Sequence, residues 1–379
     1  MKKLTIYPEA KSATFITRPN RFVMELKLKN KIIKAYMPNT GRMVEFLHPG
    51  NTFYVIKKKS PKFNYRVVAT KYQQSYVFLD TVKINSVFEK LLHLNLIDEL
   101  KNLKNIEAEK TFGNSRFDFY VTTQQNKKVI IEVKSVTLCH NQIAMFPDAA
   151  TIRGRKHIKE LNKLTSQNYK TYIYYLILNK NCHKFYPNFH TDINYCNSFL
   201  AADKVNYRAL QLNFTNPVTI NLEKLTDIPI DKKIVKENTV NKGTYILILE
   251  NNKDFYKQIG ALGKIYFQSG YYLYIGSALN SLNTRLRRHS RKNKKTHWHI
   301  DYIIPANMKI LKKIVIRRTD YIEESITKDF IKLTQTIIKG FGSTDSKAPS
   351  HLLYFKKNPF KTKQFWKIIL NYETFTENK

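Results

Sequence analysis

The sequence predicts an α/β multidomain protein that begins with a small β-barrel and continues with two α/β domains. Residues 1–82 contain short runs of alternating apolar and polar residues between turns, which favours the barrel. In residues 83–230 the apolar spacing first becomes helical and later gives a continuous apolar run, as in a buried strand. Residues 231–241 have little to pack and predict a linker. A second α/β domain is expected at 242–357, followed by a basic tail at 358–379.

The expected elements follow from these patterns in chain order. Alternation predicts barrel strands at 22–28, 31–36 and 51–56 and hairpin strands at 114–121 and 127–134, with helices at 86–103 and 154–166 and a buried strand at 172–178. The hairpin turn is the polar stretch Thr-Gln-Gln-Asn.

Composition favours a nucleic acid partner. The chain of 379 residues has 42% hydrophobic content, enough for several cores, and a net charge of +36. A basic excess of this size indicates that the protein binds a polyanion. An AT-rich genome also enriches lysine, so the clustering of arginines in short segments is the stronger signal. We expect DNA rather than RNA.

The cysteines and the apolar runs bear on the location of the protein. Cys139, Cys182 and Cys196 have no CxxC spacing, so we expect three free thiols in a reducing cytoplasm. The amino-terminal residues turn polar before a signal-peptide core builds up, and the apolar run at 172–178 is far shorter than a membrane span. We therefore expect a cytoplasmic protein without membrane contact. Its oligomeric state stays open.

Three hairpin residues have the form of a PD-(D/E)XK nuclease core. Side chains alternate across a strand, so Glu132 and Lys134 share a face, where Asp118 of the partner strand can meet them. Two carboxylates repel each other unless a divalent cation joins them, and hard oxygen ligands suit Mg²⁺ or Mn²⁺. Lys134 would stabilise the nucleophilic water or the phosphate charge. The alternative is a solvated hairpin, because this spacing also arises by chance in a lysine-rich chain.

Residues 1–230 closely resemble the sugar fermentation stimulation protein family. Five strings carry the resemblance in order: Arg18-Pro-Asn-Arg-Phe22, Pro38-Asn-Thr-Gly-Arg-Met43, Ser115-Arg-Phe-Asp-Phe119, Glu132-Val-Lys-Ser-Val-Thr-Leu138, and Phe146-Pro-Asp-Ala149 with Arg153-Gly-Arg-Lys-His157. The resemblance implies an OB-like barrel, a PD-(D/E)XK-type domain and DNA binding. It makes Asp118, Glu132 and Lys134 the metal and catalytic triad, with Glu109 as a further metal ligand and Glu107 as its alternative.

Basic and amide side chains in these strings predict contacts with a nucleic acid backbone. Arg18, Asn20, Arg21 and Arg42 form the expected barrel surface, whereas Asn39 is more simply explained as turn chemistry. Arg116 either pairs with a carboxylate or holds the scissile phosphate. A phosphate is also expected at the second helix, next to Asp148, Thr151, Arg153 and His157.

The third part resembles an uncharacterised domain family related to GIY-YIG nucleases. The strings that carry this resemblance are Gly243-Thr-Tyr245, Tyr272-Leu-Tyr-Ile-Gly-Ser-Ala278, Leu282-Asn-Thr-Arg-Leu-Arg-Arg-His289, Trp298-His-Ile-Asp-Tyr302 and Ser350-His-Leu352. It implies that Tyr245 and Tyr274 position a water, that Arg285 binds phosphate, and that Glu323, or its neighbour Glu324, holds a metal.

A basic segment follows the second signature string. Residues 285–295 hold seven Lys or Arg and no acid, which predicts nucleic acid contacts, with Arg287, Arg288, His289 and Arg291 as the candidates. We expect His297, His299 and Asp301 on one face of a strand, as phosphate contacts or hydrogen-bonding residues rather than as metal ligands. The sequence as a whole predicts a DNA-binding, metal-dependent phosphodiesterase. A non-catalytic DNA-binding regulatory protein and an RNA-processing nuclease are the alternatives.

Overall fold

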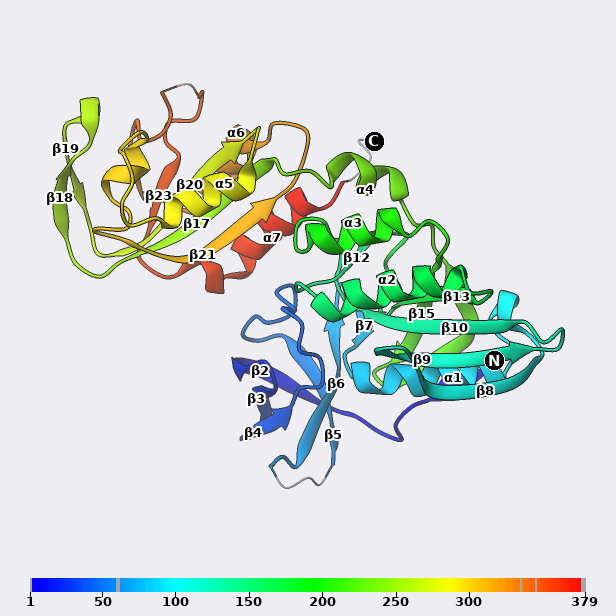
Figure 1. The fold of residues 1–379 in the computed structure, drawn as a ribbon. Helices are drawn as coiled ribbons and strands as arrows, with labels where there is room; N and C mark the ends of the chain where they lie inside the picture. The colour runs from blue at the N-terminus through cyan, green and yellow to red at the C-terminus, as the bar shows by residue number, and fades with distance from the viewer. Residues whose placement is uncertain (1, 59–61, 335, 345, 376–379) are drawn as a thin grey trace. The chain divides into compact units, whose positions relative to one another are not determined.

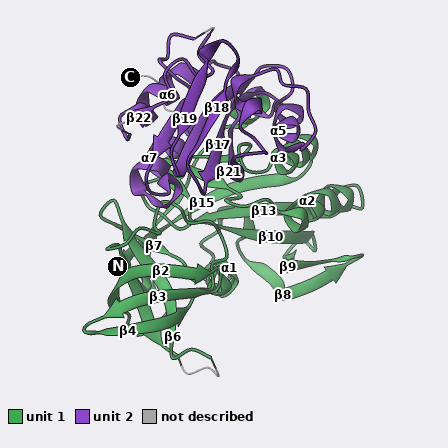
Figure 2. Cartoon of the chain, turned by 90° about the vertical axis from the view of Figure 1, so that its left-hand side faces the viewer, with its two compact units in different colours: residues 1–236 green, residues 237–379 purple. Residues whose placement is uncertain are grey.

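The computed structural model describes residues 2–58, 62–334, 336–344 and 346–375. These form two compact units, residues 1–236 and 237–379, drawn in different colours in Figure 2. The last four residues of the expected basic tail lie outside the described residues. Within the described part of the chain, no helix is long and apolar enough to cross a membrane.

The barrel of unit 1 is built from five strands. They are β2 (Lys11–Asn20), β3 (Val23–Leu28), β4 (Lys31–Tyr36), β5 (Thr52–Lys57) and β6 (Tyr65–Tyr72). The antiparallel order β4-β3-β2-β5-β6 closes on itself through a parallel pairing of β4 with β6, and β7 (Ser75–Phe78) extends it. Alternate residues such as Phe15, Met24 and Leu26 fill the interior, which is why these alternating sequences form a closed sheet.

A seven-stranded sheet is the largest sheet in the rest of unit 1 (Figure 1). Its order is β1 (Lys3–Thr5), β16 (Thr219–Asp227), β15 (Asn206–Asn216), β13 (Lys170–Ile177), β10 (Lys128–Val136), β9 (Ser115–Thr123) and β8 (Leu103–Phe112). Strand β1 precedes the barrel in sequence but pairs with β16. The barrel is therefore inserted into the sheet domain.

Helices cover both faces of this sheet. Helix α1 (Ile84–His93) packs its apolar side on β9, β10 and β13, while α2 (Ile152–Thr165), together with α3 (Ile193–Ala201), lies above β10 and β13 in Figure 1. Strand β13 is almost entirely buried for this reason, as its apolar run predicts. The first helix ends at His93 rather than near residue 103, because Asn95 adopts positive φ and the chain then enters β8.

The expectation of three free thiols is wrong. Cys139 and Cys182 form a disulfide with their Cα atoms 6.2 Å apart, and Cys196, which is buried, is outside the disulfide. The bond joins β11 (Cys139–His140) to the loop before β14 (Lys184–Pro187); β12 (Ile143–Phe146) lies between these two strands in a small sheet. Sequence spacing could not reveal this pairing, because tertiary folding brings the two segments together.

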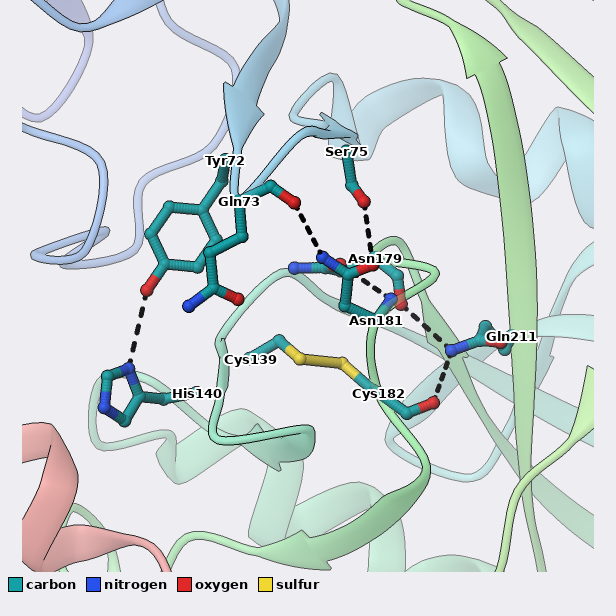
Figure 3. Close-up of a disulfide and its surroundings, with 9 residues drawn as sticks. All are labelled: Tyr72, Gln73, Ser75, Cys139, His140, Asn179, Asn181, Cys182 and Gln211. Carbon is teal, nitrogen blue, oxygen red and sulfur yellow. Dashed lines mark hydrogen bonds between the residues drawn. A yellow bond between two sulfur atoms is a disulfide. The ribbon is translucent and has the colours of Figure 1, made fainter.

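Side chains of the barrel and the sheet surround this disulfide, as Figure 3 shows. Ser75 donates to Asn181 at 2.8 Å, and the amide nitrogen of Asn181 donates to the carbonyl of Gln73 at 3.2 Å. Gln211 donates to the carbonyl of Cys182 at 2.6 Å. The disulfide thus lies beside a hydrogen-bonded contact between barrel and sheet.

Unit 2 is built on a five-stranded antiparallel sheet. Its order is β21 (Lys309–Ile316), β17 (Gly243–Asn251), β20 (Gly270–Ala278), β23 (Leu352–Phe355) and β22 (Thr336–Ile337). Three helices accompany it: α5 (Leu282–Ser290) contacts β17 and β20, α6 (Glu323–Ile331) contacts β20, and α7 (Lys363–Glu373) contacts β21. A separate two-stranded ribbon pairs β18 (Phe255–Gln258) with β19 (Lys264–Phe267).

Two segments differ from the sequence expectations. The expected linker contains helix α4 (Lys232–Asn238), in which Val235 is fully buried. The expected basic tail contains α7, capped by the hydroxyl of Thr362. Helix α7 buries Phe365, Trp366, Ile369 and Leu370, whose spacing is that of one helix face. Lysines on the other face obscured this pattern.

Candidate functional site

The hairpin of β9 and β10 brings the predicted acid pair and lysine together. In the antiparallel register Ile131 lies opposite Phe119, which places Glu132 next to Asp118. Both carboxylates and Lys134 line a cavity of about 590 Å³. The barrel contributes Arg21, Asn39, Thr40 and Gly41 to the same cavity, and the start of α2 contributes its cap Thr151 and Arg153 of its first turn. The cavity is thus a cleft between the barrel and the sheet of unit 1.

Asp118 is held by hydrogen bonds from two directions. The side-chain amide of Asn85 donates to Oδ1 at 2.6 Å, and the backbone N–H of Val133 donates to Oδ2 at 2.7 Å. Burial raises the pKa of Asp118, and the nearby Glu132 carboxylate raises it further, to about 6. The pair therefore repels, as two carboxylates that share one site do.

Glu132 is buried between two nitrogen groups. The ammonium of Lys134 contacts Oε1, and Nδ1 of His157 lies 2.6 Å from the same oxygen. Burial would raise the pKa of Glu132, but Lys134 and His157 outweigh it and hold the pKa below its ordinary value. The second oxygen, Oε2, is buried and accepts no hydrogen bond from the described residues. A buried oxygen of this kind calls for a further partner, which a water or a cation can supply.

This donor set fits a hard divalent cation. Asp118 and Glu132 offer carboxylate oxygens, and Oε2 of Glu132 is the atom without a partner. Mg²⁺ is commonly held by one or two carboxylates and keeps several waters, so two acids suffice. Within the described residues no cluster of three or more His, Cys, Asp or Glu side chains is placed to hold a metal.

Glu109 and Arg116 lie outside this cavity. The exposed carboxylate of Glu109 on β8 pairs with Arg116 at 3.1 Å. Glu109 has positive φ, which marks an irregularity in the strand and directs its side chain outward. Glu107 instead pairs with Lys110 at 2.6 Å. The structure therefore separates both glutamates from the acid pair and gives Arg116 the carboxylate partner that was one of its two expected roles.

Two of the four polar residues expected on the barrel surface have internal roles. Arg18 donates to the carbonyls of Gly41, Arg21 and Asn39 at 2.7 to 3.0 Å. Arg42 reaches across to the carbonyl of Asp148 and to the hydroxyl of Thr191, the latter at 2.9 Å. These arginines brace the cleft, because carbonyl and hydroxyl oxygens of the chain accept hydrogen bonds from their guanidinium groups.

Other residues predicted to contact nucleic acid form hydrogen bonds within turns or at a helix start. Asn20 accepts from the N–H of Phe22, and Asn39 accepts from the N–H of Gly41. Thr151 caps α2 by accepting from Gly154, so the helix amino terminus already has one hydroxyl partner. Arg21 and Arg153 remain as the arginines that line the cavity.

Unit 2 gathers a second cluster around Tyr245. The Tyr245 hydroxyl and Nε2 of His289 are 2.8 Å apart, and the Tyr274 ring lies 6.3 Å from the Tyr245 ring between centroids. Gly276 makes this possible, because a Cβ there would lie 2.5 Å from the Tyr245 hydroxyl. Burial lowers the pKa of His289 to about 3 and raises that of Tyr245 well above its ordinary value, so both groups are neutral. His289 is fully buried, and it contacts the tyrosine rather than the surface expected for a nucleic acid contact.

Glu323 and not Glu324 faces the tyrosines. The Glu323 carboxylate acts electrostatically on both Tyr245 and Tyr274, and it lies 3.2 Å from Nδ1 of His351. Glu324 is half-buried and accepts from the N–H of Lys347 at 2.9 Å. The two adjacent acids thus point in different directions from the first turn of α6.

The arginines of α5 differ in what they contact. The guanidinium groups of Arg285 and Arg288 lie 4.0 and 4.1 Å from the ring centroid of Trp298. Arg288 also donates to both oxygens of Asp301, at 3.0 and 2.9 Å. Arg287 and Arg291 are exposed. The outer arginines are free to contact a polyanion, whereas Arg288 is part of the fold.

The segment with His297, His299 and Asp301 is not a strand. Residues His299–Tyr302 form a 3-10 helix, in which Asp301 accepts from the N–H groups of residues 297 and 298. These bonds, together with Arg288 and Lys294, occupy the Asp301 carboxylate. Helical rather than extended geometry turns the three side chains apart.

Several site residues were not predicted in the roles that the structure gives them. Asn85, Trp298 and His351 reach the two clusters from elements distant in sequence. His157 was expected as a phosphate contact near a helix amino terminus, but it contacts Glu132. The one available signal was a histidine on the apolar face of α2, which indicates a buried partner.

Comparisons with known proteins agree with this architecture. Residues 16–79 match the SfsA N-terminal OB domain, residues 83–217 match the Sugar fermentation stimulation protein RE domain, and residues 244–373 match the Domain of unknown function DUF123. The predicted multidomain α/β class with an OB-like barrel is confirmed.

Individual relatives match the first unit. A sugar fermentation stimulation protein homolog of Desulfitobacterium hafniense is 34% identical over 209 residues, 55% of this chain and 90% of that protein. One of Clostridium perfringens is 38% identical over 196 residues, 51% of this chain and 85% of that protein. The structure of Pyrococcus furiosus SfsA in complex with Ca²⁺ has a TM-score of 0.56 at 29% identity and covers 61% of this chain and 100% of its own. This chain belongs to the sugar fermentation stimulation protein family and carries, after the family region, a domain that matches DUF123.

Proposed function

We propose that this protein is a DNA-binding phosphodiesterase that depends on a divalent cation, with its main centre at Asp118, Glu132 and Lys134. The observation that carries the proposal is the buried Glu132 oxygen Oε2, which has no hydrogen-bond partner among the described residues and belongs to a cavity lined by a second carboxylate and an ammonium. Burial, together with repulsion by Glu132, raises the pKa of Asp118 to about 6, and a buried acid pair of this kind is suited to a cation.

Asp118 and Glu132 would hold Mg²⁺ or Mn²⁺. When bound, such a cation activates a water and neutralises charge on a phosphate. Lys134 places an ammonium beside Glu132, where it stabilises the negative charge that develops on the phosphate. Arg21 and Arg153 line the same cavity and supply positive charge for the neighbouring phosphates of the strand. Pyrococcus furiosus SfsA forms a complex with Ca²⁺, which supports a hard, oxygen-binding cation in this family.

Unit 2 would supply a second centre. Tyr245 and His289 form a neutral phenol–imidazole pair, whose hydrogen bond would hold the phenol in place to orient an attacking water. Arg285 acts electrostatically on Tyr245 and lies next to Trp298, which positions its guanidinium for a phosphate. Glu323 would hold a cation there.

The test is cleavage of labelled single- and double-stranded DNA and RNA with Mg²⁺, Mn²⁺ or Ca²⁺, in an E323Q background that silences the second centre. We expect Asp118→Asn and Glu132→Gln to abolish cleavage while DNA affinity stays equal or rises, because each removes negative charge near phosphate. Glu109→Gln is the matched control, an exposed acid of the same sheet outside the cavity, and should cleave as its parent does. Equal cleavage by Glu132→Gln and its parent would contradict the proposal.

A non-catalytic DNA-binding protein is the second candidate. One observation favours it: both oxygens of Asp118 already accept hydrogen bonds within the chain. If the wild type binds DNA tightly but cleaves no substrate with any of the three cations, this second function replaces the first.

A further inference from the structure

The β18–β19 ribbon carries an aromatic surface that the two candidate centres do not use. It lies between the two signature strings of unit 2, as an addition to the sheet (Figure 1). Tyr256 and Tyr266 are directly opposite each other in its register, and their ring centroids are 5.0 Å apart. They are 64% and 45% exposed. Large rings exposed side by side are uncommon unless they meet a partner.

The other face of the ribbon fixes it to the core. Phe255 and Phe267 stack with centroids 5.0 Å apart, and both belong to the core of unit 2 together with Ile265. The side-chain amide of Asn251 donates to the carbonyls of Phe267 and Gln268, at 3.3 and 2.8 Å, which anchors the base of the ribbon. The exposed rings are therefore presented by a rigid support, and little conformational entropy is lost when they bind.

Further contacts fix the orientation of the two tyrosines. The Tyr266 hydroxyl donates to Asp254, whose other oxygen accepts from the N–H of Ser269 at 2.7 Å. The ammonium of Lys264 lies 5.2 Å from the centroid of the Tyr256 ring. Asp254 is thus engaged at the base of the ribbon, while Lys264, on the same face as the two tyrosines, adds positive charge beside the rings.

We propose that this ribbon is a stacking platform for unpaired bases of a nucleic acid strand, an inference that rests on the proposed nucleic acid binding. Aromatic rings beside lysines are the combination that binds single strands, because bases stack on rings and phosphates meet ammonium groups. A protein partner fits less well, since the rings lie among charged residues and form too small a patch for a stable interface.

The platform is separate from the Tyr245 cluster. Strand β17 runs from Tyr245, near its start, to Asn251, its last residue, and the ribbon begins beyond that end. Six residues of strand span about 20 Å. A DNA strand bound both at Arg285 and at the ribbon would therefore be contacted at two separate points. The contact at the ribbon would select DNA whose bases are unpaired.

The test compares Tyr256→Ala with Tyr256→Phe in the full chain, using a fluorescent single-stranded oligonucleotide over a series of salt concentrations. Tyr256→Ala should weaken binding about tenfold, because stacking is lost, whereas Tyr256→Phe should bind as the wild type does. The dependence of affinity on salt should be unchanged in both, since neither removes a charge. Lys264→Gln should instead lower the salt slope by about one.

Tyr321→Ala, which removes another exposed tyrosine of unit 2, is the control and should bind normally. Duplex DNA should bind equally well to wild type and Tyr256→Ala, because its bases are not available for stacking. If Tyr256→Ala binds single-stranded DNA as tightly as the wild type does, the proposal of a stacking platform is wrong, while the proposed function stands. If the wild type binds no nucleic acid at all, both proposals fail.

Discussion

Asp118 shows how the environment of one residue couples charge to stability. Its pKa rises to about 6, so the folded protein retains a proton that an unfolded chain releases near its ordinary value of 3.8. The stabilisation that the Asp118 carboxyl contributes to the folded state is fully present below pH 3.8. It falls as the pH rises from 3.8 and is lost above pH 6. At neutral pH the metal-free acid pair therefore lowers the free energy of unfolding, and a bound cation would reduce this destabilisation.

We predict that Asp118→Asn stabilises the metal-free protein at high pH only. Its advantage over the wild type in free energy of unfolding should grow by about 2 kcal/mol between pH 4 and pH 8, because asparagine carries no charge. Urea denaturation in a chelator measures this difference. An advantage of the same size at both pH values would show that Asp118 does not titrate in this range.

Gly41 is the second informative residue, at the contact of barrel and sheet. A Cβ there would lie 2.1 Å from Oδ2 of Asp148, a carboxylate that accepts hydrogen bonds from the backbone N–H groups of Arg42 and Met43 and would have to shift from them. We predict that Gly41→Ala lowers the free energy of unfolding by about 1 to 3 kcal/mol, as overpacking does. The exposed neighbour Thr40 is the control, and Thr40→Ala should change stability little. Thermal unfolding of the two variants gives the comparison.

At the scale of elements, helix α5 combines structural and binding arginines. We predict that Arg287→Gln lowers the salt slope of DNA binding by about one with no change in stability, because its guanidinium is exposed. Arg288→Gln should instead destabilise unit 2 by about 1 to 3 kcal/mol, because the fully buried Asp301 carboxylate loses its paired donor. Equal effects of the two substitutions on stability would contradict this division.

Elements fixed by local patterns were predictable from the sequence, and contacts between distant elements were not. Alternation and a polar turn gave the β9–β10 hairpin, and with it the meeting of Asp118, Glu132 and Lys134. The partner of Cys139 and the role of His157 depend on tertiary folding, which no spacing shows. His289 was assigned to a basic surface because its neighbours are basic, yet helical geometry turns it inward to Tyr245.

At the scale of the molecule, the boundary of unit 2 is set by α7. We predict that a fragment of residues 237–379 folds alone, whereas one that ends at residue 357 does not. The shorter fragment loses Phe365, Trp366 and Ile369, whose burial covers apolar side chains such as Phe330 of α6. Circular dichroism and thermal melting of both fragments test this. A cooperative melt of the shorter fragment would show that α7 is dispensable.

The pairing of β1 with β16 constrains the order in which a ribosome-bound chain can fold. Lys3 of β1 pairs with Asn221 of β16, so the first strand of unit 1 can pair only after the last strand of unit 1 has been synthesised. At a synthesis rate of roughly 5 to 20 residues per second, the ribosome needs about 10 to 40 s to make the segment between these two residues. All five barrel strands are complete by Tyr72, so the barrel can close during that time. The nascent protein would therefore form its inserted domain first and complete the host sheet around it afterwards.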